Sequence, residues 1–154
     1  VQSVTRRGKY IVIQLRRSKG KDSCYLLVHL RMSGSLLVAP SSKPAATHDR
    51  VLIRVSGGKD LRFNDTRKFG RVYACEDPQS LLGKLGPEPL DKGFSWARLL
   101  VLLRAKSARI KPLLLDQRFI AGIGNIYADE ALWRSGIQPL TCSNLISPTK
   151  ARKL

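Results

Sequence analysis

Residues 116–136, with the sequence DQRFIAGIGNIYADEALWRSG, place a glycine-rich turn directly before an amphipathic helix. Gly122 and Gly124 let the backbone approach another group closely, because they carry no side chain. The residues that follow have helical periodicity, and Gly136 suits the end of that helix. A helix that begins near Asn125 behind such a turn offers backbone amides and a favourable dipole to an anion. The stretch therefore predicts a turn, a helix and an anion site at the helix start.

The chain carries a large excess of positive charge. Its 154 residues include 28 Lys and Arg against 11 Asp and Glu, a formal net charge of +17. Residues 1–89 contain 17 basic and 7 acidic side chains (17 − 7 = +10), and residues 90–154 contain 11 and 4 (11 − 4 = +7), so the excess is not confined to a tail. A broad cationic surface favours a polyanionic partner. We therefore expect the anion to be a nucleic-acid phosphate.

Composition also limits the other classes of function. The hydrophobic content of 43% is enough for a folded core, and no apolar run approaches the roughly 20 residues of a membrane helix, so we expect no membrane contact. The three cysteines, Cys24, Cys75 and Cys142, include no Cys-x-x-Cys pair and indicate reduced thiols rather than disulfides or a metal site. Val1 is not a natural first residue, so we expect a fragment of a longer protein.

The first half of the chain has the short apolar runs and polar turns of an antiparallel β unit, either a sandwich or a barrel. Ser56-Gly57-Gly58-Lys59 is typical of a hairpin turn between two of these runs. The charged segment 16–21 is predicted to form another hairpin tip. The predicted strands cover residues 9–15, 25–30, 35–39, 51–55, 60–63 and 71–74.

The second half has helical periodicity, which makes the whole chain an α+β protein. Gly86-Pro87-Glu88-Pro89 disfavours both helix and central strand, so we place a domain boundary there, between residues 1–89 and 90–154. Ser95 suits the N-cap of the first helix, and Pro148 suits the first turn of the last one. The first predicted helix begins at Trp96 and has Arg104 and Lys106 in its last turn. The second covers residues 112–116 or a little beyond, and two more begin near Asn125 and at Ser147-Pro148.

Five motifs, in order along nearly the whole chain, resemble those of the formamidopyrimidine-DNA glycosylase family, the bacterial 8-oxoguanine repair enzymes. They are TRRGKY, HLRMSGSL, FNDTRKFG, LGPEPL and IKPLLLDQRFIAGIGNIYADEALWRSGIQP. The resemblance implies a β-sandwich domain followed by a helix–two-turn–helix domain, and a partner that is damaged double-stranded DNA. It also implies a monomer that acts in the cytoplasm at the nucleoid.

The resemblance assigns a void-filling role to Met32, Arg67 and Phe69. A glycosylase must move the damaged base out of the stack before it can reach the sugar, and other groups must then occupy the hole. Met and Phe can wedge between bases, and Arg can bond to the orphaned partner base. Each residue alone would be interpreted as core or surface, but all three lie within matching motifs.

The other matched positions lie beside the DNA backbone or the reacting sugar. Lys9 matches a family lysine that assists elimination at the abasic sugar, a role that suits a Lys of lowered pKa. Tyr127 could pack beneath the phosphate clamp, but we expect it in the core. Asp116 and Glu130 could act as paired carboxylates, although we prefer pairing with nearby Arg or Lys. The residues matched to DNA contacts are His48, Arg67, Lys106, Lys111, Gly124, Asn125 and Tyr127.

The sequence departs from the family pattern at both ends. Members begin with a Pro-Glu pair, in which the proline amine attacks the sugar and the glutamate assists, and they carry a C-terminal zinc finger. Neither is present here, so we expect no cofactor in this chain, one zinc ion in complete members, and no catalysis by these 154 residues alone. The alternatives are an endonuclease VIII-type enzyme for oxidised pyrimidines and a non-catalytic DNA-binding remnant. A ribosomal RNA binder would leave HLRMSG and FNDTRKFG unexplained.

Overall fold

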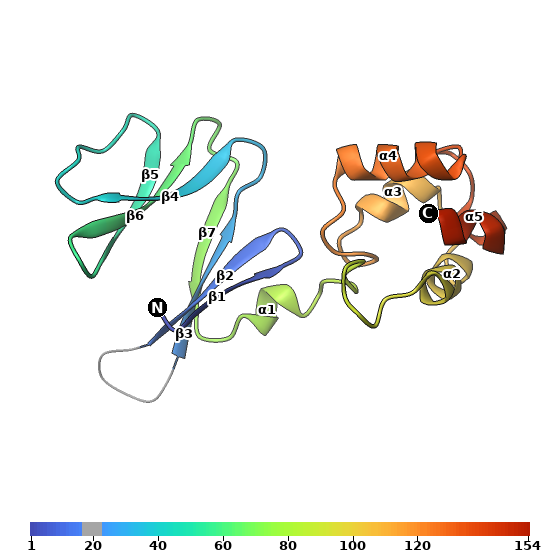
Figure 1. The fold of residues 1–154 in the computed structure, drawn as a ribbon, viewed down its shortest axis with the longest axis horizontal. Helices are drawn as coiled ribbons and strands as arrows, with labels where there is room; N and C mark the ends of the chain where they lie inside the picture. The colour runs from blue at the N-terminus through green and yellow to red at the C-terminus, as the bar shows by residue number, and fades with distance from the viewer. Residues whose placement is uncertain (17–22) are drawn as a thin grey trace. The chain divides into compact units, whose positions relative to one another are not determined.

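The computed structural model describes residues 1–16 and 23–154, and it divides into two compact units, Val1–Pro78 and Gln79–Leu154 (Figure 1). Each unit is described by itself below. The predicted hairpin tip at residues 16–21 lies almost entirely outside the described residues.

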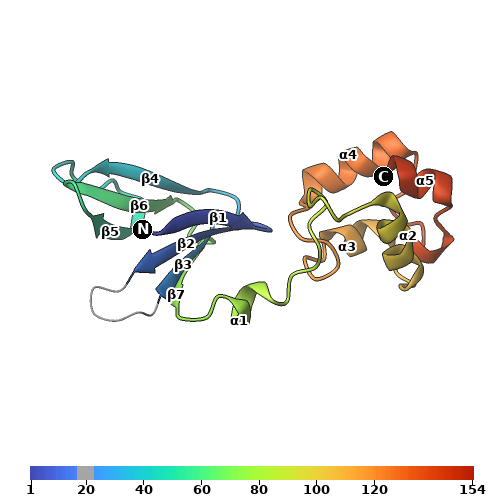
Figure 2. The same ribbon diagram turned by 60° about the horizontal axis from the view of Figure 1, so that its bottom comes forward.

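Seven strands make up the described part of the first unit, in two antiparallel sheets (Figure 2). One sheet has the order β1-β2-β3-β7 and the other β4-β6-β5. Six of the seven were predicted; β1 was not, because its sequence SVTRR has no sustained apolar alternation. The strands are β1 (Ser3–Arg7), β2 (Tyr10–Arg16), β3 (Ser23–His29), β4 (Gly34–Pro40), β5 (Asp49–Val55), β6 (Lys59–Asp65) and β7 (Arg71–Cys75).

The core of this unit lies between the two sheets. Ile13, Leu26 and Val28 from the first sheet pack with Phe63 from the second, and partly buried Leu, Ile and Val side chains surround them. Alternate residues of β2, β3, β5 and β6 belong to this core, as expected from the two-residue period of a strand. The β-sandwich prediction is therefore confirmed.

Strand β6 is the centre of the second sheet and carries unusual buried charges. Its hairpin with β5 turns at Gly57 and Gly58, which both have positive φ, as the sequence predicted. Arg62 is buried on β6 and donates hydrogen bonds to the carbonyls of the loop after β4, at Pro40, Lys43 and Pro44. It also forms ion pairs with Asp49 and Asp60, so its charge is compensated within the protein.

The second unit is helical, and its predicted caps are confirmed. The Ser95 hydroxyl accepts a hydrogen bond from the Arg98 amide, and Gly136 ends the longest helix in the left-handed conformation. The helices are α1 (Gln79–Leu82), α2 (Trp96–Arg104), α3 (Ile110–Leu115), α4 (Asn125–Ser135) and α5 (Pro148–Lys153), with a 3₁₀ turn, η1 (Ser143–Leu145), between the last two.

A single apolar cluster holds the helical unit together. Leu103, Ile110 and Leu132, from α2, α3 and α4, are fully buried in it, together with Ile120 from the segment that precedes the glycine-rich turn. Ile120 and its neighbours in this core therefore fix the turn before α4 from beneath.

Among the described helices none is long and apolar enough to cross a membrane.

The division between the units falls earlier than the boundary that the prolines indicated. The Gly86 amide donates to the Gln117 carbonyl, and the Ala121 amide donates to the Pro87 carbonyl, so the Gly-Pro-Glu-Pro segment packs within the helical unit. A Cβ on Gly86 would lie 2.5 Å from the carbonyl oxygen of Phe119, which shows how closely the segment approaches. Prolines signal the absence of regular structure here, not the edge of a compact unit.

Candidate nucleic-acid interface

Two loops of the β unit bring Met32, Arg67 and Phe69 into one exposed cluster. Met32 lies in the turn between β3 and β4, and the other two lie in the loop between β6 and β7. The Met32 side chain is 76% exposed and Phe69 is 49% exposed. Arg67 joins them: its Nη1 lies 3.7 Å from the Met32 sulfur, and its guanidinium lies 4.8 Å from the centre of the Phe69 ring. Large apolar groups held together in water are suited to entering an apolar space.

Beneath this cluster lies the buried carboxylate of Asp65, at the end of β6. It accepts hydrogen bonds from the Ser33 hydroxyl at 2.5 Å, the Gly70 amide at 2.8 Å and the Arg67 amide at 3.2 Å. These bonds, led by that from Ser33, hold the pKa of Asp65 below its ordinary value. Asp65 is therefore ionised at neutral pH.

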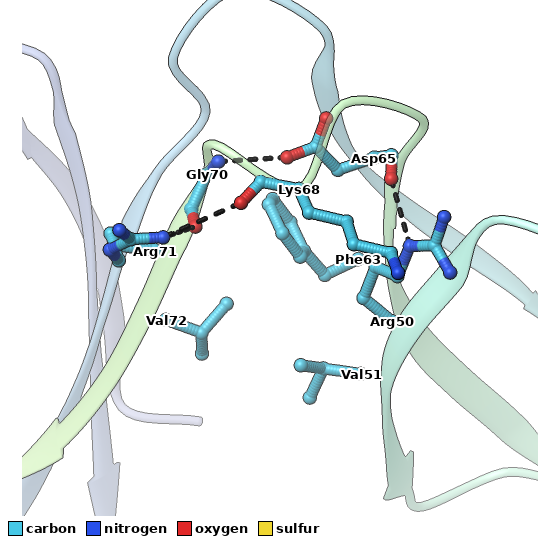
Figure 3. Close-up of a pocket in the computed structure, with 8 residues that line it drawn as sticks. All are labelled: Arg50, Val51, Phe63, Asp65, Lys68, Gly70, Arg71 and Val72. Atoms are coloured by element: carbon cyan, nitrogen blue, oxygen red, sulfur yellow. Dashed lines mark hydrogen bonds between the residues drawn. The ribbon is translucent and has the colours of Figure 1, made fainter.

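Cations surround a hollow of about 300 Å³ beside this carboxylate, between β5, β6 and β7 (Figure 3). Its floor is apolar, and Arg50, Lys68 and Arg71 line its rim. The Arg50 Nε donates to the Asp65 carbonyl oxygen at 2.9 Å, and its Nη2 lies 3.1 Å from the Nδ1 of His48. His48 thus lies beside Arg50 in a cationic part of the surface.

Lys9 lies in a second cationic hollow, at the turn between β1 and β2. Arg6, His29 and Arg31 line the same hollow. Loss of surrounding water, followed by the charge of Arg31, lowers the pKa of Lys9. The pKa of His29 is lowered by burial first and then by Arg31 and Lys9, which favours a neutral ring. The residues that line this hollow include no carboxylate, so it suits an anion.

In the helical unit the glycine-rich turn is shaped by Gln117. Its Oε1 accepts from the Gly122 amide at 2.9 Å, and its Nε2 donates to the carbonyls of Leu115 and Ile123 at 3.0 and 2.8 Å. Gly122 has a φ of +95°, a conformation that favours glycine. The next glycine, Gly124, is the N-cap of α4, and no side chain caps the helix there. The first amides of α4 therefore have no side-chain cap within the protein, which leaves them suited to an anion.

The other residues of the helical unit that were matched to DNA contacts, Lys106, Lys111 and Asn125, have different neighbours from one another. Lys111 pairs with Asp129 of α4 at 2.7 Å, whereas Lys106 follows α2 and lines a different hollow with Asp116 and Arg118. Asn125 is the exposed first residue of α4.

The prediction that Tyr127 packs in the core is wrong, because its side chain is 74% exposed. Helical spacing explains the difference: Ala128, Leu132 and Ser135 form the buried stripe of α4, and Tyr127 lies outside it. Tyr127 is thus available to a partner at the start of α4.

The preferred interpretation of Asp116 and Glu130 agrees with the structure. Asp116 pairs with Arg118 at 3.1 Å and accepts the Arg118 amide, and Glu130 pairs with Arg134 one helical turn away at 3.7 Å. The bond and charge of Arg118 lower the pKa of Asp116. They are bound to separate arginines rather than arranged as an acid–base pair.

The three cysteines are divided between the two units. Cys24 and Cys75 lie on the neighbouring strands β3 and β7, Cys142 lies in the helical unit, and all three are free thiols. Across residues 1–16 and 23–154, no three His, Cys, Asp or Glu side chains gather as metal ligands.

Comparison with protein-family models gives two matches that together cover most of the chain. Residues 1–72 match the formamidopyrimidine-DNA glycosylase N-terminal domain, and residues 85–154 match the formamidopyrimidine-DNA glycosylase H2TH domain. The chain belongs to the formamidopyrimidine-DNA glycosylase family. The two matched domains correspond to the β unit and to most of the helical unit.

Curated relatives carry the same family name. The formamidopyrimidine-DNA glycosylase of Protochlamydia amoebophila is 44% identical over 147 residues, which are 96% of this chain and 51% of the relative. That of Moorella thermoacetica is 46% identical over 143 residues, 90% of this chain and 50% of the relative. The chain thus spans about half the length of these relatives.

Solved structures of family members share the fold. A MutM in complex with DNA containing carbocyclic 8-oxo-G has a TM-score of 0.85 and 34% identity, over 99% of this chain and 57% of that one. The Lactococcus lactis formamidopyrimidine-DNA glycosylase bound non-covalently to DNA with an AP site has a TM-score of 0.85 and 34% identity. The match covers 99% of this chain and 58% of that chain.

Three residues of this family member escaped the sequence-based reasoning. Asp65, Gln117 and His29 each lie within a quoted motif or next to a residue singled out, yet none has an obvious role from its type alone. Each owes its importance to the contacts that the fold gives it, such as the bond from Ser33 to Asp65 and the bond from the Gly122 amide to Gln117. Their presence inside the motifs was the only available signal.

Proposed function

We propose that this protein is a base-excision repair glycosylase that removes oxidised purines from double-stranded DNA and then cleaves at the abasic sugar by elimination. The observation that carries the proposal is the exposed cluster of Met32, Arg67 and Phe69. The apolar side chains of Met32 and Phe69 suit the gap left by a flipped base, and the guanidinium of Arg67 can donate hydrogen bonds to the base opposite that gap. The cluster lies in a chain that belongs to a family of DNA glycosylases.

The charged surfaces support contacts with the DNA backbone. In the β unit these are His48 with Arg50, and the hollow lined by Lys9 and Arg31. In the helical unit we propose that the Gly124 turn and the first amides of α4 hold one phosphate. The proposed helical contacts are Lys106, Lys111, Gly124, Asn125 and Tyr127.

Lys9 is proposed to act beside the reacting sugar. An amine of lowered pKa exchanges a proton more readily near neutral pH than an ordinary lysine does. Proton transfers of this kind assist elimination of the sugar phosphates. His29, with its own lowered pKa, adds a neutral ring to the same hollow.

The purine branch of the family is favoured over the endonuclease VIII-type branch, because the complete trio is present and its members touch. We retain two further proposals from the resemblance: that the protein acts as a monomer, and that it works in the cytoplasm at the nucleoid. A binding-only function is the alternative if no base is released.

Binding by the 154-residue chain tests the recognition step. Fluorescence anisotropy would compare a duplex containing one abasic site with the same duplex undamaged, at several salt concentrations. We expect tighter binding to the abasic duplex, and an affinity that falls with the logarithm of salt concentration because phosphate contacts release counterions. Equal affinity for both duplexes would overturn the proposed recognition of a missing base.

A further inference from the structure

Among the described residues of the β unit, Asp65 is the most completely buried acidic residue, with 1% of its surface exposed. It ends β6 at the point where the chain enters the loop that carries Arg67 and Phe69. Gly34, which follows the Met32 turn, lies opposite it in the β4–β6 register. Asp65 therefore lies where the two DNA-facing loops meet.

The two carboxylate oxygens of Asp65 divide their bonds between these loops. Oδ1 accepts the Ser33 hydroxyl, next to Met32, and also the Arg67 amide. Oδ2 accepts the Gly70 amide on the far side of Phe69. Gly70 approaches so closely that an added Cβ would lie 3.1 Å from Oδ2 and 2.3 Å from Phe63 Cζ. The carboxylate thus fixes both ends of the Arg67–Phe69 segment and one end of the Met32 turn.

The backbone of Asp65 holds a third loop. Its amide donates to the His48 carbonyl at 2.9 Å, and its carbonyl accepts from Arg50 Nε at the same distance. Figure 3 shows the carboxylate and the carbonyl of Asp65 directed to opposite partners, Gly70 and Arg50. One residue therefore connects three loops that we assign to DNA.

We propose that Asp65 is a positioning residue, which holds Met32, Arg67 and Phe69 in the arrangement needed to fill the gap in the duplex. This inference rests on the proposed function of the trio. Loops that are ordered before binding lose less conformational entropy when they insert, so the same contacts give a more complete insertion. Loops of this length without such an anchor are ordinarily mobile.

The geometry requires a carboxylate rather than its amide. The donors that surround Asp65 are a hydroxyl and backbone amides, and both of its oxygens are used. Asparagine would present an NH₂ group to one set of these donors and lose that bond. The lowered pKa agrees, since hydrogen bonds from Ser33 and the amides stabilise the charged form.

The test is a fluorescence measurement at the gap itself. A duplex would carry 2-aminopurine opposite one abasic site, and the change in its emission would be read at saturating protein, so that affinity does not enter. Wild-type chain should produce a large change, and Phe69→Ala should remove it. Asp65→Asn should give a smaller change than wild type, because the loss of one buried hydrogen bond lowers the equilibrium constant for the ordered loop by about fivefold or more.

Asp60→Asn is the matched control. Asp60 is a buried aspartate on the same strand, also hydrogen-bonded by a serine, Ser41, but at the opposite end of β6 from the trio. Its variant should give the wild-type signal. Ser33→Ala removes only the link to the Met32 turn and should give an intermediate signal.

Each outcome separates the two ideas. If wild type and Phe69→Ala give the same signal, the proposed function of the trio fails. If they differ while Asp65→Asn matches wild type, the positioning role is wrong, and the same holds if Asp60→Asn loses as much signal as Asp65→Asn. If Asp65→Asn does not fold, Ser33→Ala decides: a reduced signal supports the role and a wild-type signal overturns it.

Discussion

The β unit ties its exposed loops to buried ionised side chains, whereas the helical unit shapes its turn with a neutral amide above an apolar core. In the β unit Asp65 holds the Arg67 loop and Arg62 holds the loop after β4. In the helical unit Gln117 makes three hydrogen bonds around Gly122, and the residues beneath are leucine, isoleucine and phenylalanine.

The proposed function gives this difference a physical reason. Loops that enter a duplex must project from the fold and cannot bury apolar side chains of their own, so a buried charge with several donors is a compact anchor. A phosphate clamp uses backbone amides instead, and these need only a rigid helix start. The β loops should therefore set discrimination for damage, and the helical turn should set general affinity.

The largest expected effect comes from the apolar core of the helical unit. Leu103→Ala should cost about 2–5 kcal/mol of unfolding free energy, because Leu103 is fully buried and its loss leaves a cavity. Both tryptophans, Trp96 and Trp133, lie in this unit, so their emission in a urea titration reports on it alone. The exposed Leu140→Ala should change stability by less than about 0.5 kcal/mol. Equal effects would show that the core does not hold the unit.

Two glycines sharpen the contrast. Gly70→Ala should cost about 1–3 kcal/mol, because its Cβ would lie 2.3 Å from Phe63 Cζ. Gly122→Ala meets no atom within 4 Å but must adopt a φ of +95°, at a cost of about 1–2 kcal/mol. Hydrogen exchange of the β6 and α4 amides would measure the units separately. If Gly70→Ala reduced protection in α4, or Gly122→Ala reduced protection in β6, the account of that glycine would be contradicted.

Binding experiments should separate discrimination from affinity. Arg67→Ala should reduce the preference for an abasic over an undamaged duplex by about tenfold, because the contact with the orphaned base is lost. Gln117→Ala should weaken binding to both duplexes equally, by about fivefold. Arg54→Ala removes a comparably exposed charge and should leave the preference unchanged. If Gln117→Ala changed the preference for the abasic duplex, the helical turn would not be restricted to general affinity.

The smallest expected effect is a difference in acid response. The pKa of Asp65 is lowered in the folded protein, so its contribution to stability is present above the unfolded pKa of about 3.9 and is lost as pH falls through the lower folded value. The Gly70 amide, which bonds to Asp65, should shift in NMR spectra only below about pH 4. The Gly122 amide bonds to Gln117 and should shift much less. Equal shifts would contradict the contrast between charged and neutral anchors.

The sequence predicted the regular elements where local signals were strong. The Gly57-Gly58 hairpin, the Ser95 cap and the Gly136 cap each depend on one or two neighbouring residues, and each is present. Strand β1 and the short helix α1 were missed, because SVTRR and QSLL carry neither a long period nor a cap. Burial of Tyr127 was predicted wrongly, since a tyrosine on a helix can face either way.

The site was predictable only as far as the motifs extend. Met32, Arg67 and Phe69 could be named from two motifs, but their mutual contact required the fold. The anchoring role of Asp65 depends on a hydroxyl 32 residues away along the chain, and that pairing has no local signature. Tertiary hydrogen bonds of this kind are what single-sequence reasoning cannot supply.

The most direct test of the account is a crystal structure of this chain with a duplex that contains an abasic site. We predict that Met32 and Phe69 occupy the gap, that Arg67 bonds to the base opposite, and that a phosphate lies against the amides that follow Gly124. A complex in which the gap is closed or empty, with these three side chains in solvent, would contradict the central claim.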